Sequence, residues 1–313
     1  MSPIRRGLRQ YLTLRCRLGF ALKDVRWALD KFVRFLETEG AAHITTELAL
    51  RWATQAVGVQ PATSAWRLGT VRRFALWLSA LDPRTEVPPQ GLLPFRYRRR
   101  RPYIYSDAEI ERIVRTAAKL RSPQGLRART YSTLFGLLAA TGMRIGEAVA
   151  LDREDVDLVE AVLSIRRAKR GKSRLLPVQT STRMVLRAYA EARDRLLPHP
   201  ATPAFLLSER GGRVTRCMAE WTFAQVSKTV GLRSPDRRWG KGPRLHDMRH
   251  RFAAKTLIEW YRAGLDVERE IPKLSTYLGH ASINDTYWYI EAVPELLQLA
   301  TDRLEGRRAA PRP

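Results

Sequence analysis

Five prolines in one short stretch constrain the fold of this chain more than any other feature of its sequence. They lie between Asp82 and Tyr105, and they are Pro83, Pro88, Pro89, Pro94 and Pro102. Proline lacks the amide hydrogen that a helix interior needs, and its ring clashes with the preceding turn. A continuous helix through this stretch is therefore excluded, and the sequence predicts an extended linker there.

The length of the chain agrees with a division at this linker. Single hydrophobic cores usually stop growing before 313 residues, and 44% hydrophobic residues are enough to fill two. We predict a helical domain over residues 1–92, a basic linker over 93–105 and a second domain over 106–313. The sequence contains no run of 18 or more apolar residues, so it predicts no transmembrane helix. The basic N-terminus lacks the apolar stretch of a secretory signal.

The charge of the chain points to its partner. Lys and Arg number 56 against 31 Asp and Glu, which gives a net charge of +25 and a pI near 11.0. Residues 1–105 carry a net charge of +12 and residues 106–313 one of +13, so both parts are basic. A GC-rich genome would explain part of the arginine content but not the shortage of acids. The predicted partner is a polyanion, and nucleic acid is the polyanion that the charge favours.

Arginines are concentrated inside the linker itself. The cluster consists of Arg96, Arg98, Arg99, Arg100 and Arg101. Such a run is either a solvated surface or a strap that follows a phosphate backbone, and its place beside prolines favours the strap.

Hydrophobic periodicity predicts a mostly α fold with a small β-sheet. In the first part, apolar residues at helical spacing predict three helices, over 22–36, 48–53 and 66–78. In the second part, Ser106 and Glu109 form a capping box ahead of a helix. Two short strands are expected at 161–165 and 175–178, and further helices at 131–140, 181–197, 219–230, 246–263 and 294–306.

The residues available for metal binding argue against a metal or a cofactor. Cys16 and Cys217 are the two cysteines, and they are far apart and lack the spacing of metal ligands or of a disulfide framework. The chain also lacks a Walker A loop and a dense carboxylate cluster. We therefore expect no cofactor and no metal, and a cytoplasmic location.

Four patches of the second part carry residues suited to chemistry on a phosphate. They are 141–147, 172–174, 244–250 and 277–289. Arginine forks can neutralise the charge that develops on a phosphate, a tyrosine can attack it, and a lysine can protonate the leaving oxygen. Each residue alone is a weak signal, because a single arginine is usually a surface residue, but the ordered set is specific.

This ordered set resembles the tyrosine recombinases, also called the phage integrase family. The resemblance covers the second part, and the helical first part with its linker looks like the core-binding domain of that family. It implies six catalytic residues and a supporting Glu147. The six are Arg144, Lys172, His246, Arg249, His280 and Tyr289. Tyr287 is a second phenol where many members have one, and the long stretch 260–275 is similar to recombinases of mobile elements.

The resemblance also implies a reaction and an assembly. Tyr289 would attack a scissile phosphate in double-stranded DNA and form a 3′-phosphotyrosyl link, which a second 5′-hydroxyl would then resolve. The outcome would be integration, excision or transposition of a mobile element. A type IB topoisomerase would share the chemistry but rejoin the same strand. A DNA-binding accessory recombinase without activity would lack an intact catalytic set, and an RNA-binding protein would carry RNA-binding signatures that are missing.

The C-terminal segment raises a question of assembly. Leu296, Leu297, Ala300 and Leu304 recur at helical spacing and give a helix one apolar stripe. The stripe could pack on its own domain. The resemblance implies instead that it docks on a neighbouring subunit and links a tetramer around two duplexes.

Binding of DNA should depend steeply on salt, because both parts are strongly basic. Each phosphate that the protein neutralises contributes a slope of about −0.9 in log K against log salt. Replacing Arg98, Arg99, Arg100 and Arg101 with Ala should weaken binding to all sequences alike and flatten the slope in a titration series. An unchanged slope would show that the strap does not contact DNA.

Overall fold

A computed structural model of the chain describes residues 2–95, 101–166, 173–234, 242–280 and 282–309. The chain divides into two compact units, Met1–Arg100 and Arg101–Pro313. The predicted bounds 1–92, 93–105 and 106–313 stay predictions. No helix among the described residues is long and apolar enough to cross a membrane.

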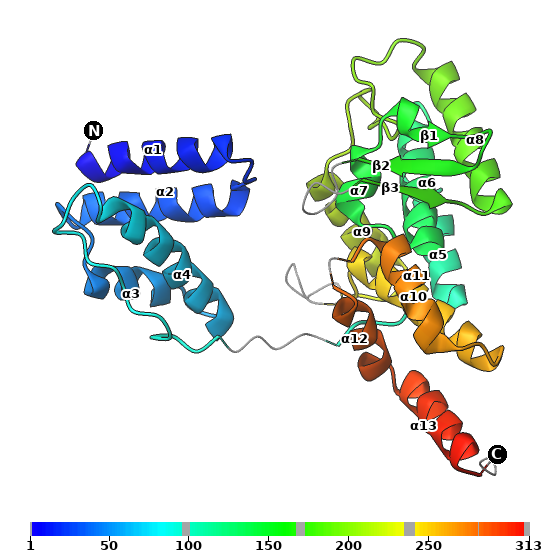
Figure 1. Cartoon of the computed structure of the whole chain (residues 1–313). Coiled ribbons are helices and arrows are strands. Elements are labelled where there is room, and N and C mark those ends of the chain that lie inside the picture. The colour runs from blue at the N-terminus through cyan, green and yellow to red at the C-terminus, as the bar shows by residue number, and fades with distance from the viewer. Residues whose placement is uncertain (1, 96–100, 167–172, 235–241, 281, 310–313) are drawn as a thin grey trace. The chain divides into compact units, whose positions relative to one another are not determined.

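The first unit is helical throughout its regular structure, as the sequence predicts (Figure 1). Its helices are α1 (Pro3–Arg17), α2 (Lys23–Thr38), α3 (Thr46–Thr54) and α4 (Pro61–Leu78). Sequence periodicity predicts α2, α3 and α4, and the structure adds α1, which was not predicted. This helix begins where the Ser2 side chain accepts a hydrogen bond from the Arg5 amide, with proline at the first helical position.

All four of these helices contribute to one core. Leu8 of α1, Phe32 of α2, Trp52 of α3 and Phe74 of α4 are buried, and the rings of Phe32 and Trp52 lie 5.2 Å apart. The start of the proline-rich segment packs against the same unit. The Glu86 amide donates to the Ile44 carbonyl at 2.8 Å, and Arg72 Nη1 donates to the Pro88 carbonyl at 2.5 Å.

The second unit combines helices with one three-stranded sheet. The described elements are α5 (Asp107–Ala117), α6 (Leu126–Thr141), α7 (Ile145–Ala150), the 3-10 helix η1 (Arg153–Asp155), β1 (Val156–Asp157), β2 (Val162–Ile165), β3 (Arg174–Pro177), α8 (Thr180–Leu196), α9 (Arg216–Thr229), α10 (Leu245–Arg262), α11 (Val267–Leu278), α12 (Asn284–Ala292) and α13 (Pro294–Ala309). The strands pair antiparallel in the order β1-β2-β3, with Leu163 opposite Leu176. The predicted fold class, mostly α with a small sheet, is confirmed.

Helix α6 is the centre of the larger core. It packs against α5, α8 and α10, and its Leu134, Phe135 and Leu138 are buried. The Phe135 ring meets the ring of Phe223 from α9 edge-on at 5.5 Å. This apolar helix is held on several sides, so the loop that follows its last residue, Thr141, starts from a fixed point.

A second, smaller core lies among the last four helices. Leu257 of α10, Leu274 of α11, Tyr289 of α12 and Leu296 of α13 are all buried in it. Leu296 is fully buried while its neighbour Leu297 is 47% exposed. The first turn of α13 therefore places Leu296 in the core of its own unit and leaves Leu297 exposed, and docking of the helix on a neighbouring subunit stays a prediction.

The two adjacent leucines of α13 give a matched test of this packing. Leu296→Ala should lower the free energy of unfolding by about 2–5 kcal/mol, because it leaves a cavity in the smaller core. Leu297→Ala should change it by less than about 0.5 kcal/mol, as expected of an exposed position. Urea titration of the full chain measures both values. Equal effects of the two changes would contradict the packing of α13 seen here.

Candidate active site

Arg249 is held inside the protein by two helix ends. It lies in the second turn of α10, and the residue is 2% exposed. Its Nη1 donates to the Gly142 carbonyl at 3.0 Å, after α6, and its Nη2 to the Leu278 carbonyl at 2.8 Å, at the end of α11. Carbonyls in the last turn of a helix lack partners within the helix and carry partial negative charge. They offset part of the cost of burying this cation.

Arg144 meets Arg249 at the end of α11. It precedes α7, and its Nη2 donates to the Gly279 carbonyl at 2.8 Å, one residue beyond the carbonyl that Arg249 uses. Its Nη1 donates to Glu147 Oε1 at 2.7 Å. The Arg144 side chain keeps 24% of its surface exposed, so it can still meet a ligand.

Glycine is required at both of the positions that cap these helices. Gly142 has φ +61° and Gly279 has φ +68°, values that side chains rarely adopt. A Cβ on Gly142 would lie 2.6 Å from the Phe252 ring, and one on Gly279 would lie 2.6 Å from Arg174 Nη1. The absence of a side chain at these two positions therefore leaves room for Phe252 beside Gly142 and for Arg174 beside Gly279.

Glu147 is an ionised carboxylate between two arginines. Burial alone would raise its pKa, but hydrogen bonds from Arg174 and Arg144 outweigh burial and lower the pKa to about 2. Arg174 Nη2 donates to Glu147 Oε2 at 2.8 Å. Glu147 thus orients its neighbours and is not poised to transfer a proton near neutral pH.

Two histidines of the cluster are neutral at pH 7. Desolvation, followed by the charges of Arg249 and Arg144, lowers the pKa of His280 to about 3. Desolvation by the surrounding protein, followed by the charges of Arg249 and Arg244, lowers the pKa of His246 to about 4, although the residue keeps an exposed face. His280 Nδ1 lies 2.7 Å from Thr286 Oγ1 at the start of α12, which fixes the ring.

Tyr289 is buried beside these groups. It is 3% exposed, and its ring centroid lies 5.9 Å from that of His280 and 5.4 Å from that of His250. Burial raises the pKa of Tyr289, and the charge of Arg249 and its hydrogen bond to the phenol oppose that rise. Tyr287 is 38% exposed, so the two phenols of α12 do not face the same surroundings.

The structure brings most of the predicted site residues together in one place. The cluster consists of Arg144, Glu147, His246, Arg249, His280 and Tyr289. Lys172, Arg96, Arg98, Arg99 and Arg100 lie outside the described residues, and Arg101 is exposed. The sequence did not single out Arg174 or His250 as site residues. Arg174 stands in one of the four patches, but its contacts are with residues far along the chain, which no local pattern reveals.

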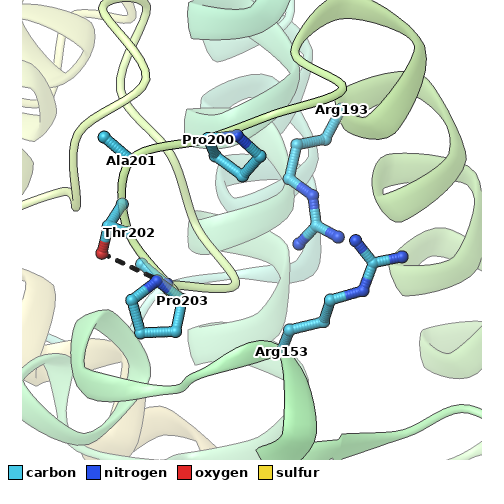
Figure 2. A pocket seen from close by; sticks show the side chains of 7 residues that line it. Arg153, Arg193, Pro200, Ala201, Thr202 and Pro203 are labelled. Atoms are coloured by element: carbon cyan, nitrogen blue, oxygen red, sulfur yellow. Dashed lines mark hydrogen bonds between the residues drawn. The ribbon is translucent and has the colours of Figure 1, made fainter.

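A hollow in the second unit is lined by residues outside this cluster. It has a volume of about 390 Å³ and is lined by Arg153, Arg193 and the loop 200–204 (Figure 2). Both guanidinium groups bind the carboxylate of Asp194, at 2.7 Å from Arg153 Nη2 and 2.8 Å from Arg193 Nε. Their charge is thus partly neutralised. Within the described ranges, no group of three or more His, Cys, Asp or Glu residues could hold a metal ion.

Comparisons with known proteins agree on one family. The sequence model of the phage integrase family matches residues 104–295. The chain is 46% identical to y4rB of Sinorhizobium fredii, which is named as an integrase/recombinase, over 98% of each chain. The fold is similar to that of the XerH recombinase bound to its difH substrate (TM-score 0.65, 18% identity, 92% of this chain and 80% of that one). It is also similar to that of the Tn1549 transposon integrase with transposon end DNA (TM-score 0.61, 16% identity, 96% and 99%).

The stability of the protein should fall as the pH drops below about 6.5. His280 has a pKa of about 3 in the folded chain against 6.5 in the unfolded chain, so the unfolded chain takes up the proton first and gains stability. Glu147 acts in the same direction below 4.5, because its folded pKa is about 2. The melting temperature of His280→Gln should fall less between pH 6.5 and pH 5 than the melting temperature of wild type. The exposed His199→Gln is the control, and equal losses in wild type and His280→Gln would contradict the assignment.

Proposed function

The chain belongs to the phage integrase family of tyrosine recombinases, which cut and rejoin DNA at specific sites, and we propose that Tyr289 is its nucleophile. The observation that supports this most strongly is the surroundings of the phenol. Tyr289 lies next to Arg249, within the cluster that also holds Arg144 and two neutral histidines. A phenol near two cations is suited to attack on a phosphate between them.

The two arginines would bind the scissile phosphate. Arg249 is fixed by carbonyls and donates toward the Tyr289 phenol, while Arg144 has part of its guanidinium exposed. Two guanidinium groups can hydrogen-bond the non-bridging oxygens and neutralise the negative charge that builds up on a five-coordinate phosphorus. Because both are anchored before the substrate arrives, little reorganisation is needed when the charge develops.

The reaction is then a pair of transesterifications. The Tyr289 oxygen forms a bond to phosphorus while the bond from phosphorus to the 5′-oxygen breaks. The phenol proton passes to one of the neutral imidazoles, His246 or His280, and Lys172 gives a proton to the leaving 5′-oxygen. A 5′-hydroxyl from a partner duplex attacks the 3′-phosphotyrosyl link in the reverse sense, so the bond energy is retained and ATP is not required.

The partners of the reaction are double-stranded recombination sites. The XerH structure holds a palindromic difH substrate, and the Tn1549 integrase structure holds transposon right end DNA. We extend this to Arg96, Arg98, Arg99, Arg100 and Arg101 as contacts to the DNA backbone. We also propose a tetramer on two duplexes, a cytoplasmic location, and the integration, excision or transposition of a mobile element as the outcome.

A nicked suicide substrate tests the nucleophile. Tyr289→Phe should bind DNA with unchanged affinity but form no covalent adduct, because it lacks the attacking oxygen. Tyr287→Phe, the matched control on the same helix, should still form the adduct, and gel electrophoresis after denaturation separates the two results. The reverse pattern would disprove the assignment.

A wild-type protein that relaxes supercoils but never exchanges strands between two sites would be a type IB topoisomerase. A wild-type protein that forms no adduct would be an accessory DNA-binding protein.

A further inference from the structure

A buried hydroxyl connects the ends of two helices in the site. Thr286 lies in the first turn of α12 and is fully buried, and its Oγ1 lies 2.7 Å from His280 Nδ1. His280 follows the end of α11, where its own amide donates to the Ser275 carbonyl at 3.0 Å. The backbone of His280 is therefore held by α11, and its ring is held by a side chain of α12.

Thr286 stands one turn before Tyr289 on the same face of α12. Residues three apart on a helix are neighbours, and both of these side chains are buried. The ring of Tyr289 stacks beside that of His280, with 29° between the ring planes and 5.9 Å between the centroids. The hydroxyl of Thr286 thus ties His280 to the helix that carries the proposed nucleophile.

The surroundings of this hydroxyl decide which group donates the hydrogen bond. A hydroxyl has one proton to give, and a neutral imidazole carries one N–H. Among the residues that the structure describes, the contact with His280 Nδ1 is the one hydrogen bond of Thr286 Oγ1. If Nδ1 were the donor, the proton of a fully buried hydroxyl would lack an acceptor, which is costly inside a protein. The Thr286 hydroxyl therefore donates to Nδ1.

This direction fixes the tautomer of His280. Desolvation and the charges of Arg249 and Arg144 lower the pKa of the imidazole to about 3, so the ring is neutral at pH 7 and has one proton to place. Because Nδ1 accepts, that proton is on Nε2. The Nε2–H group can donate to an oxygen of a phosphate that the two arginines bind, and Nε2 cannot at the same time take up a proton.

We propose that Thr286 is a positioning residue for DNA cleavage, which holds His280 as the Nε2–H tautomer and ties its ring to the helix of Tyr289. This inference rests on the proposed function, in which Tyr289 attacks a bound phosphate. Thr286 itself contacts His280 and acts through it. Of the two neutral imidazoles in the cluster, His246 is then the one that takes the phenol proton.

The tautomer can be measured on the full chain without DNA and without catalysis. Long-range proton–nitrogen NMR spectra of ¹⁵N-histidine-labelled protein at pH 7 distinguish a protonated ring nitrogen from an unprotonated one, and His280→Ala identifies the signals of His280. Wild type should carry the proton on Nε2. Thr286→Val should give a mixture of tautomers, and Thr286→Ser, which keeps the hydroxyl, should restore the single form. A wild-type proton on Nδ1 would overturn the inference.

The effect on cleavage is measured as the single-turnover rate of adduct formation on the nicked suicide duplex at saturating DNA. Thr286→Val should be about tenfold slower, the factor of a single hydrogen bond, and Thr286→Ser should stay within about threefold of wild type. Thr229→Val is the matched control, because the Thr229 hydroxyl donates to the Gln225 carbonyl of its own helix, α9. This control should match wild type.

A double variant separates the role from a purely structural one. If Thr286 acts through His280, Thr286→Val combined with His280→Ala should react no more slowly than His280→Ala alone. Losses that multiply, or equal losses of Thr286→Ser and Thr286→Val, would show an effect of packing alone and overturn the inference. The wild-type tautomer decides the matter even where Thr286→Val does not fold. If wild type shows the Nε2–H tautomer but forms no adduct, the proposed function fails and the contact of Thr286 stands.

Discussion

Backbone carbonyls at the ends of two helices hold the pair of arginines around which the site is built. Arg249 reaches the Gly142 and Leu278 carbonyls, and Arg144 reaches the carbonyl of Gly279. A carbonyl attracts a guanidinium group without neutralising it, so these contacts leave the charge of Arg249 for a phosphate, whereas Arg144 is also paired with Glu147. Carboxylates in the same positions would bind the arginines more tightly and would compete with the substrate. Glu147 is a carboxylate that does bind Arg144, but its negative charge is shared with a second cation, Arg174.

This arrangement explains why the helices end where they do. Helix α6 has to stop at Thr141 and α11 at Leu278, so that free carbonyls of their last turns face α10. The glycines that follow both helices turn the chain away in the left-handed region and leave room for Phe252 and Arg174. The neutral state of the histidines has two causes. Desolvation lowers their pKa values most, and the positive charge of the arginines at these helix ends lowers them further.

Much of this could be read from local sequence patterns, and the rest depends on long-range packing. The capping box at Ser106, the two strands joined by a turn and the apolar helix before Gly142 all appear within a few residues of sequence. Helix α1 was missed although Ser2 and Pro3 mark its start, because its many arginines mask the apolar spacing. The short α7 and β1 and the helix α11, with a proline inside, have weak local signals and are stabilised by their neighbours.

The site shows the same limit. The order of the motifs was enough to expect Arg144, Arg249 and His280 together. Residues two apart on a helix point in different directions, so Tyr287 and Tyr289 cannot both face the same site. Which phenol lies inside depends on α12 packing against α10 and α11. The contact between Arg174 and Glu147 joins residues whose spacing has no periodic meaning, so the sequence alone offers no reason to connect them.

Burial of Tyr289 has a consequence for the cell that makes this protein. A recombinase that cuts DNA away from its own sites damages the genome, and here the proposed attacking oxygen belongs to a side chain that is 3% exposed and forms part of the small core. A stray phosphate that meets the free protein finds Arg144 at the surface but no accessible nucleophile. If Tyr289 is the nucleophile, as proposed above, its phenol has to become accessible before a strand can be cut. The same packing that stabilises the last helices would thus keep the free protein from cutting DNA that it meets by chance.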